Sequence, residues 1–190
     1  MRPSVRFTVL NGTLALACVL SVAARSALAQ PAGGVVADLV SDVNETQQKF
    51  IALAKAIPPE KYDWRPATGV RSVSEVLRHV ASDNYLIPAA LGHAADASTG
   101  IKGEDYKTAQ AFEARKATKE QTIADLEKSF ANLKSAMQGT PASKLGDQVK
   151  LFGQPFTMQK AWVLGTTHLH EHLGQLIAYA RVNGVKPPWS

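Results

Sequence analysis

Cysteine is almost absent from this chain, in which Cys18 is the one thiol among 190 residues. Cys18 lies in an N-terminal segment that we expect to be removed on export. A disulfide, a catalytic thiol and thiolate ligation of a metal are then excluded from the remaining chain. Any metal chemistry there has to use histidine and carboxylate ligands.

The sequence also lacks internal repeats, a glycine-rich phosphate loop and a low-complexity tail. Concentrated basic charge is missing as well. The first 29 residues contain three arginines and no acid, so their removal lowers the formal net charge from +5 to +2. Mixed charge without a basic face argues against a nucleic-acid-binding protein.

The N-terminus has the pattern of a cleavable signal peptide. Arg2 and Arg6 precede a mostly apolar stretch over residues 7–24, and Ala27-Leu28-Ala29 offers small residues where a signal peptidase reads. We predict cleavage after Ala29. Residues 1–29 are then the signal peptide, residues 30–190 form a single domain, and the mature protein is periplasmic or secreted.

Two alternatives keep the chain at a membrane. A retained anchor is disfavoured because residues 11–13, Asn-Gly-Thr, leave the stretch short of the ~20 apolar residues that a spanning helix needs. A lipid anchor at Cys18 is disfavoured because Val19 and Leu20 follow it and its preceding residues fit a lipoprotein site poorly. We therefore expect no stable membrane insertion after cleavage.

Helical periodicity dominates the mature chain. Apolar residues recur at three-or-four spacing over residues 36–57, 76–87, 123–137 and 158–179, and capping boxes at Ser72 and Thr118 open two of these segments. Thr157 can cap the last segment. Residues 93–107 are predicted as a loop and residues 144–156 as a short hairpin or irregular excursion. Four long helices with short connections predict an all-α bundle.

His168 and His172 are the most informative residues. Four helical residues advance about 400° and about 6 Å, so both imidazoles leave one face and can converge on one ion. The same stripe carries Trp162 and Leu169, which places the pair toward the core. His170 lies about 200° from His168 around the helix and should face outward.

A third histidine lies on the inward stripe of the second helix. His79 is followed four residues later by Asp83, which shares its face. Asp83 is the candidate catalytic residue, with three roles left open: fourth metal ligand, orienting group or general base. The competing interpretation is a solvated acid near the helix end. Glu171 follows the outward His170, so an HExxH metalloprotease pattern does not fit.

The chain resembles the DinB-like family of four-helix metal proteins. The resemblance rests on Trp64-Arg65-Pro66, on Leu77-Arg78-His79-Val80-Ala81 and on the HxxxHxGQL run over residues 168–176, and spans about residues 35–190. It implies an up-down four-helix bundle with one divalent metal bound by His79, His168 and His172. Family members include thiol-cofactor-dependent transferases and isomerases.

Three neutral imidazoles leave a coordination position for water or substrate, unlike a closed structural site. Such an ion can act as a Lewis acid or lower the pKa of water to about 7. Zinc, nickel, iron and manganese all accept imidazole, so the identity of the divalent metal stays open. The alternative is that these are core histidines satisfied by hydrogen bonds.

The sequence thus predicts an exported metal-dependent enzyme of hydrolase or transferase type acting on a small molecule. Low-molecular-weight thiols are mainly cytosolic, so an exported location favours hydrolysis over thiol transfer. The alternative is a non-catalytic helical module that binds a metal or a small ligand. Turnover separates the two hypotheses. Assembly as a homodimer is left open.

Overall fold

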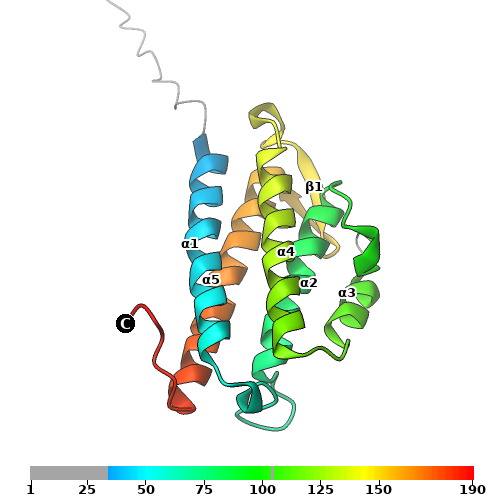
Figure 1. Ribbon diagram of the computed structural model, residues 1–190. Coiled ribbons are helices and arrows are strands. Elements are labelled where there is room, and N and C mark those ends of the chain that lie inside the picture. Colours follow the sequence, from blue (N-terminus) through cyan, green and yellow to red (C-terminus); the bar gives the residue numbers. More distant parts are fainter. Residues whose placement is uncertain (1–33, 104) are drawn as a thin grey trace, which may run out of the picture. The chain divides into compact units, whose positions relative to one another are not determined.

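The computed structural model describes residues 34–103 and 105–190 (Figure 1). The predicted signal peptide, residues 1–29, lies outside the described residues. Within them the structure is mostly helical, with a two-stranded antiparallel hairpin. The elements are α1 (Gly34–Ala56), α2 (Val73–Ala90), α3 (Tyr106–Glu113), α4 (Lys119–Gln138), β1 (Gln148–Leu151), β2 (Gln154–Thr157) and α5 (Met158–Val182).

The long helices begin where the sequence predicts. The hydroxyl of Ser72 accepts from the backbone N–H of Glu75, and the Glu75 carboxylate accepts from the Ser72 N–H, which completes a capping box at α2. Thr118 and Gln121 form the same reciprocal pair at α4. Thr157 caps α5 through the N–H of Lys160. These hydroxyls satisfy backbone donors that have no partner inside the helix.

The apolar stripes of α1, α2, α4 and α5 form one core. Burial of these side chains removes apolar surface from water at about 25 cal/mol per Å², which is the main driving force for assembling the helices. The largest fully buried side chains are Trp162, Phe50, Phe130, Leu53, Ile57, Leu77, Leu86, Leu126, Leu133, Met137, Leu151 and Leu169.

The order of the helices differs from an up-down bundle. Each of α1 and α2 packs against both α4 and α5, so α1 and α2 lie diagonally across the core. Figure 1 shows α2 and α4 running in the same direction, as do α1 and α5. Asn84 of α2 contacts Ser129 and Asn132 of α4 along this parallel pair. The predicted up-down order is therefore wrong, although the bundle itself is confirmed.

The connection between α2 and α4 explains the parallel order. Two neighbouring helices that run in the same direction need a connection that returns along the bundle, which a short turn cannot supply. The described residues 91–103 and 105–118 belong to this return and include α3, which packs on α2 (Figure 1). The sequence predicts part of this segment only as a loop, because eight residues carry too short a periodic pattern to stand out.

The segment predicted as a hairpin or excursion is a hairpin. Gln148 pairs with Thr157 and Leu151 with Gln154, so two residues make the turn. These are Phe152, with φ of 52°, and Gly153, with φ of 75°. Successive residues at positive φ match the right-handed twist of a tight hairpin, and glycine adopts this conformation without strain.

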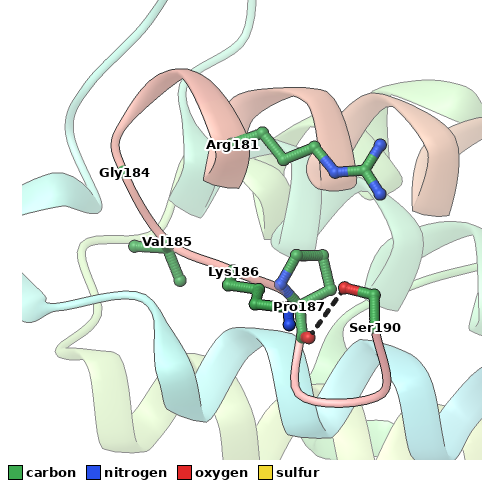
Figure 2. Close-up of a pocket in the computed structure, with 6 residues that line it drawn as sticks. All are labelled: Arg181, Gly184, Val185, Lys186, Pro187 and Ser190. Carbon is green, nitrogen blue, oxygen red and sulfur yellow. Dashed lines mark hydrogen bonds between the residues drawn. The ribbon is translucent and has the colours of Figure 1, made fainter.

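After α5 the chain folds back in a short tail. Gly184, with φ of 76°, lets the N–H of Val185 donate to the carbonyl of Ala180, which closes the helix. A surface pocket of about 390 Å³ lies at this end, and Figure 2 shows the residues that line it. The three predicted histidine ligands are not among its lining residues, which are Arg181, Gly184, Val185, Lys186, Pro187 and Ser190. Among the described residues, no helix is both long and apolar enough to span a bilayer.

The Thr118 cap offers a direct test of these helix boundaries. Replacing Thr118 with Ala removes the acceptor for the Gln121 N–H, so we expect the free energy of unfolding to fall by about 1 kcal/mol. Urea denaturation measures the change. Thr118→Ser keeps the hydroxyl and should retain most of the stability. Equal losses in both variants would contradict the capping role.

Candidate metal centre

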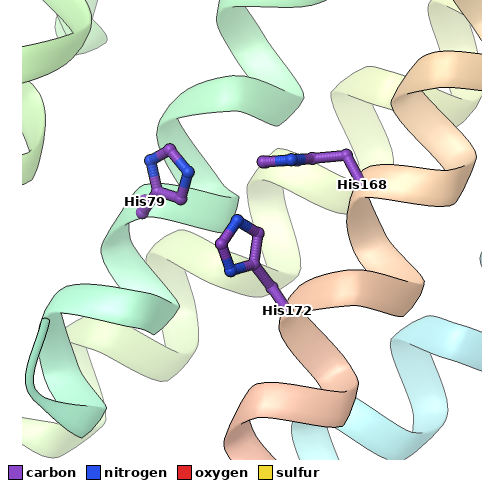
Figure 3. A group of neighbouring side chains, drawn as sticks. All are labelled: His79, His168 and His172. Carbon is purple, nitrogen blue, oxygen red and sulfur yellow. The ribbon is translucent and has the colours of Figure 1, made fainter. Parts of the chain in front are cut away.

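The packing of α2 against α5 brings three histidines together. His79 comes from α2, and His168 and His172 come from successive turns of α5 (Figure 3). The two helices run antiparallel, so the middle of one faces the middle of the other. His79 is buried, and the other two rings are partly buried. The site therefore lies between two helices that belong to the core.

The three rings are mutually close and nearly perpendicular. Their centroids are 5.1 Å apart for His79 and His168, 4.7 Å for His79 and His172, and 4.4 Å for His168 and His172. One nitrogen from each ring lies within 4.8 Å of the others. Nitrogens at about 2.0–2.1 Å from one ion lie at most about 4 Å apart, so a small side-chain adjustment suffices. The predicted convergence is confirmed.

Glu113 holds the far side of the His79 ring. Its Oε1 accepts a hydrogen bond of 2.7 Å from His79 Nδ1 and one of 3.0 Å from Ser82 Oγ. Arg71 lies 3.4 Å from the other carboxylate oxygen, and Arg78 Nε donates to the Glu113 carbonyl at 2.8 Å. Because a carboxylate only accepts, Nδ1 carries the proton and Nε2 has a free lone pair.

The charge state of Glu113 suits its role as the hydrogen-bond acceptor for His79 Nδ1. Burial acts to raise its pKa, but hydrogen bonds from His79 and Ser82, together with the positive charge of Arg71, outweigh that effect. The pKa of Glu113 therefore lies below its usual value, and the side chain is a carboxylate at neutral pH. An ionised acceptor orients the imidazole and raises its basicity as a ligand.

His172 is oriented by an amide. Gln175 Oε1 accepts from His172 Nδ1 at 2.8 Å, and Gln175 Nε2 donates to the Tyr179 hydroxyl at 2.9 Å. Tyr179 packs edge-on against Trp64, with ring centroids 5.3 Å apart. The amide carbonyl fixes the proton on Nδ1, so Nε2 of His172 is also free.

The environment of His172 disfavours its charged form. Burial lowers its pKa to about 4, assisted by the neighbouring His168 and His79 and opposed by the Gln175 hydrogen bond. His172 is consequently neutral at physiological pH. Neutral imidazole is the form that binds metal ions.

His168 presents a nitrogen with no hydrogen-bond partner. Its Nε2 is buried, and among the described residues it makes no hydrogen bond. Asp83 Oδ2 is 3.0 Å away, but this contact is an ion pair by distance and is not aligned as a hydrogen bond. A buried nitrogen that lacks a partner carries a desolvation cost, which coordination of a metal ion would remove.

Asp83 lies inside the site. Its side chain is buried, with Oδ2 3.6 Å from Nε2 of His79 and 3.0 Å from Nε2 of His168. The competing interpretation of a solvated acid at the helix end is therefore wrong, because the inward stripe of α2 continues one turn past His79. His79 and Asp83 also form a second close group with Glu113.

His170 and Glu171 lie away from this cluster. His170 faces α1, where its Nε2 is 2.7 Å from Asp42 Oδ2 and 3.4 Å from Thr46 Oγ1. Its side chain is 49% exposed, which confirms the predicted outward direction. Glu171 is exposed as well. Neither residue can replace a member of the triad without a change of helix face.

Sequence reasoning missed Glu113. Its carboxylate contacts His79 across 34 positions of sequence, and no periodic spacing links a residue at the end of α3 to one in α2. Its neighbours carry no motif that distinguishes it from a solvated acid. Only the return of the chain through α3 places it on the histidine.

A family model connects this geometry with known proteins. The model of the DinB superfamily matches residues 43–176, which include all three histidines. The chain belongs to the DinB superfamily. This DinB protein has no significant match among curated protein sequences.

Solved structures share the fold of this DinB protein. A conserved protein from Enterococcus faecalis is 19% identical, with a TM-score of 0.64 over 77% of this chain and 95% of that one. YfiT from Bacillus subtilis is 14% identical, with a TM-score of 0.62 over 80% and 89%. It is described as a probable metal-dependent hydrolase with an unusual four-helix bundle topology.

A further similar structure is the mycothiol-dependent maleylpyruvate isomerase. It is 12% identical, with a TM-score of 0.59, and the match covers 74% of this chain and 60% of that one. The TM-scores of these structures establish a common fold. Their low sequence identities leave the reaction of this DinB protein to be argued from its own residues.

The low pKa of His172 predicts how stability depends on pH. In the metal-free protein His172 should titrate near pH 4, and in the unfolded chain near its ordinary 6.5. The unfolded state then binds more protons between these values, so stability should fall as the pH drops from about 6.5 toward 4. NMR of the imidazole resonances measures the titration, and thermal unfolding measures the stability.

His172→Asn is the matched control for this pH dependence. It removes the titrating ring, so the fall in stability over this pH range should become shallower. A His172 titration near 6.5 in the folded protein would contradict the predicted environment.

Proposed function

We propose that this protein is an exported metal-dependent enzyme, in which His79, His168 and His172 hold one divalent ion. The observation that carries the proposal is the state of the three rings. His79 and His172 each have Nδ1 held by an acceptor, which frees Nε2, and His168 Nε2 is buried without a hydrogen-bond partner among the described residues. This donor set fits zinc, nickel, iron or manganese.

The alternative of core histidines satisfied by hydrogen bonds explains this arrangement less well. Such histidines would have both ring nitrogens paired, because an unpaired buried polar atom is costly. Here Nδ1 of His79 and Nδ1 of His172 are paired, whereas Nε2 of His168 is buried and makes no hydrogen bond among the described residues. The low pKa of His172 further favours a neutral, ligand-competent ring.

The chain's own residues have distinct roles in this proposal. A divalent ion bound here would supply Lewis acidity and lower the pKa of a water molecule. Glu113 and Gln175 keep two imidazoles in one orientation, and Tyr179 fixes the Gln175 amide. Asp83 places a carboxylate beside two of the histidines.

Hydrolysis of a small molecule is the reaction class we favour. YfiT supports it through the same fold and its description as a metal-dependent hydrolase. The mycothiol-dependent isomerase points instead to thiol chemistry on this fold. Export decides between them, because low-molecular-weight thiols are mainly cytosolic. This preference therefore depends on cleavage of the N-terminal segment.

Turnover tests the enzymatic part of the proposal. The protein, purified without a polyhistidine tag and without added metal, should contain about one divalent ion per chain by elemental analysis. A panel of small ester and amide substrates should then show activity that chelation abolishes and metal restores. Metal or ligand binding without turnover of any substrate class would support the non-catalytic module instead.

Replacing the histidines one at a time tests the ligand set. Ala at position 79, 168 or 172 should weaken metal binding strongly and remove the stabilisation that bound metal confers on the folded protein. Isothermal titration with Zn²⁺ and thermal unfolding with and without metal measure both effects.

His170→Ala is the internal control on the same helix. His170 faces Asp42 and Thr46 of α1, so its loss should leave metal affinity nearly unchanged. Comparable losses of affinity in His170→Ala and His168→Ala would mean that the wrong helix face has been assigned to the site.

Export is tested by the N-terminus of the protein from cells. We expect the mature chain to begin at Gln30 and to be found in the periplasm or the medium. N-terminal sequencing of protein from fractionated cells provides the measurement. An intact Met1 in the cytoplasm, or an acylated Cys18, would contradict this part of the proposal and reopen thiol-dependent transfer.

A further inference from the structure

We propose that Asp83 is a fourth protein ligand of the metal centre, so that the ion is held by three imidazole nitrogens and one carboxylate oxygen. The inference rests on the proposed metal site and goes beyond its three histidines. It chooses among the ligand, orienting and general-base roles that the sequence leaves open.

Asp83 lies beside the ring nitrogens of His79 and His168 that are proposed to bind the metal. Glu113 occupies the Nδ1 side of His79, so the free lone pair is on Nε2. Asp83 Oδ2 lies 3.6 Å from this Nε2 and 3.0 Å from Nε2 of His168. An orienting residue contacts the nitrogen opposite the metal, as Glu113 does. Asp83 is instead on the ligand side of His79.

The distances from Asp83 Oδ2 to Nε2 of His79 and His168 match those between two ligands of one ion. Two ligands at about 2.0–2.1 Å from one ion lie about 2.9 Å apart when they subtend a right angle and about 3.4 Å apart in a tetrahedron. The observed 3.0 and 3.6 Å are close to these values. A general base that acts on a water between itself and the ion would lie farther from the histidine nitrogens. The short contacts therefore favour direct ligation.

The contact between Asp83 Oδ2 and His168 Nε2 is short but is not aligned as a hydrogen bond. A carboxylate that simply accepted from His168 Nε2–H at 3.0 Å would be aligned with that bond, yet the pair makes no hydrogen bond. Asp83 Oδ1 is also buried without a hydrogen-bond partner among the described residues. Such an offset is expected when the oxygen and the nitrogen aim at a common point instead of at each other.

Asp83 places a negative charge in a buried position. The Asp83 side chain is 7% exposed, and its ion-pair contacts among the described residues are to His79 and His168. A buried carboxylate without a permanent cation is costly unless a metal ion or a protonated histidine neutralises it. A divalent ion supplies this charge while leaving the imidazoles neutral.

Asp83 is not equidistant from the triad. The group of mutually close ligand atoms contains the three histidines without Asp83. The close contacts of the Asp83 carboxylate within the site are to Nε2 of His79 and Nε2 of His168.

Cobalt(II) is the probe for the test because its visible absorption reports on its ligands. The untagged protein is titrated with Co²⁺, and affinity is measured by competition with a chelator. Asp83→Asn should lower affinity more than 100-fold and change the visible bands of any bound cobalt. Glu113→Gln is the matched control for an orienting carboxylate: affinity should fall about 10–100-fold with the bands in place.

Asp83→Cys gives a positive signal that does not depend on loss of binding. A thiolate in contact with Co²⁺ should produce a charge-transfer band in the near ultraviolet. The predicted mature chain, residues 30–190, contains no cysteine, so the wild-type protein is the blank. His170→Cys, on the exposed face of α5, should give no band. Circular dichroism establishes that each variant is folded.

The outcomes separate this inference from the proposed function. Failure of the wild-type protein to bind cobalt, or tight binding by His168→Ala, would overturn the three-histidine site itself. Cobalt bound through the histidines, with unchanged affinity and bands in Asp83→Asn and no new band in Asp83→Cys, would overturn only the role of Asp83. Weakened binding with altered bands and a thiolate band would support it.

Discussion

The burial of polar side chains between α2 and α5 is the constraint on which the rest of this structure depends. A helical core is held together by apolar contacts, and each polar atom placed inside it must recover the hydrogen bonds it loses in water. Glu113 and Gln175 meet this demand for the outer nitrogens of His79 and His172. Among the residues that the structure describes, the nitrogens on the inner side of the three rings have no aligned hydrogen-bond partner, so this is where a metal ion could bind.

The unusual helix order and the site have a common origin. Because α2 and α4 run in the same direction, the chain has to return along the bundle between them, and it does so through α3. The last residue of α3 is Glu113, which lies against His79. A short turn between α2 and α4 would remove both the parallel packing and this carboxylate. Topology and electrostatics of the site are thus linked through one connection.

Membership of the DinB superfamily places this protein among folds that serve more than one chemistry. Structures only 12–19% identical superpose with TM-scores of 0.59–0.64. They include one described as a probable metal-dependent hydrolase and one named as a mycothiol-dependent isomerase. The fold alone therefore does not decide the reaction, which depends on the residues of each site. In this chain two carboxylates contact the His79 ring, Glu113 at Nδ1 and Asp83 at Nε2.

Much of this arrangement follows from sequence alone, because it depends on local rules. Capping boxes at Ser72 and Thr118 set helix starts through bonds that span three residues, and the pair His168 and His172 shares a face because of helical pitch. These features involve neighbours in the chain, so their spacing encodes them. The family resemblance adds His79 as the third member of the cluster.

The tertiary structure decided what spacing cannot encode. The relative direction of α2 and α4 depends on where a connection packs, and the sequence shows no periodic trace of it. The partnership of Glu113 with His79 and the burial of Asp83 arise from contacts across the bundle. An acid has the same appearance in sequence whether it is solvated or buried. Its environment is set only when distant segments pack together, since burial and charge partners are properties of the assembled core.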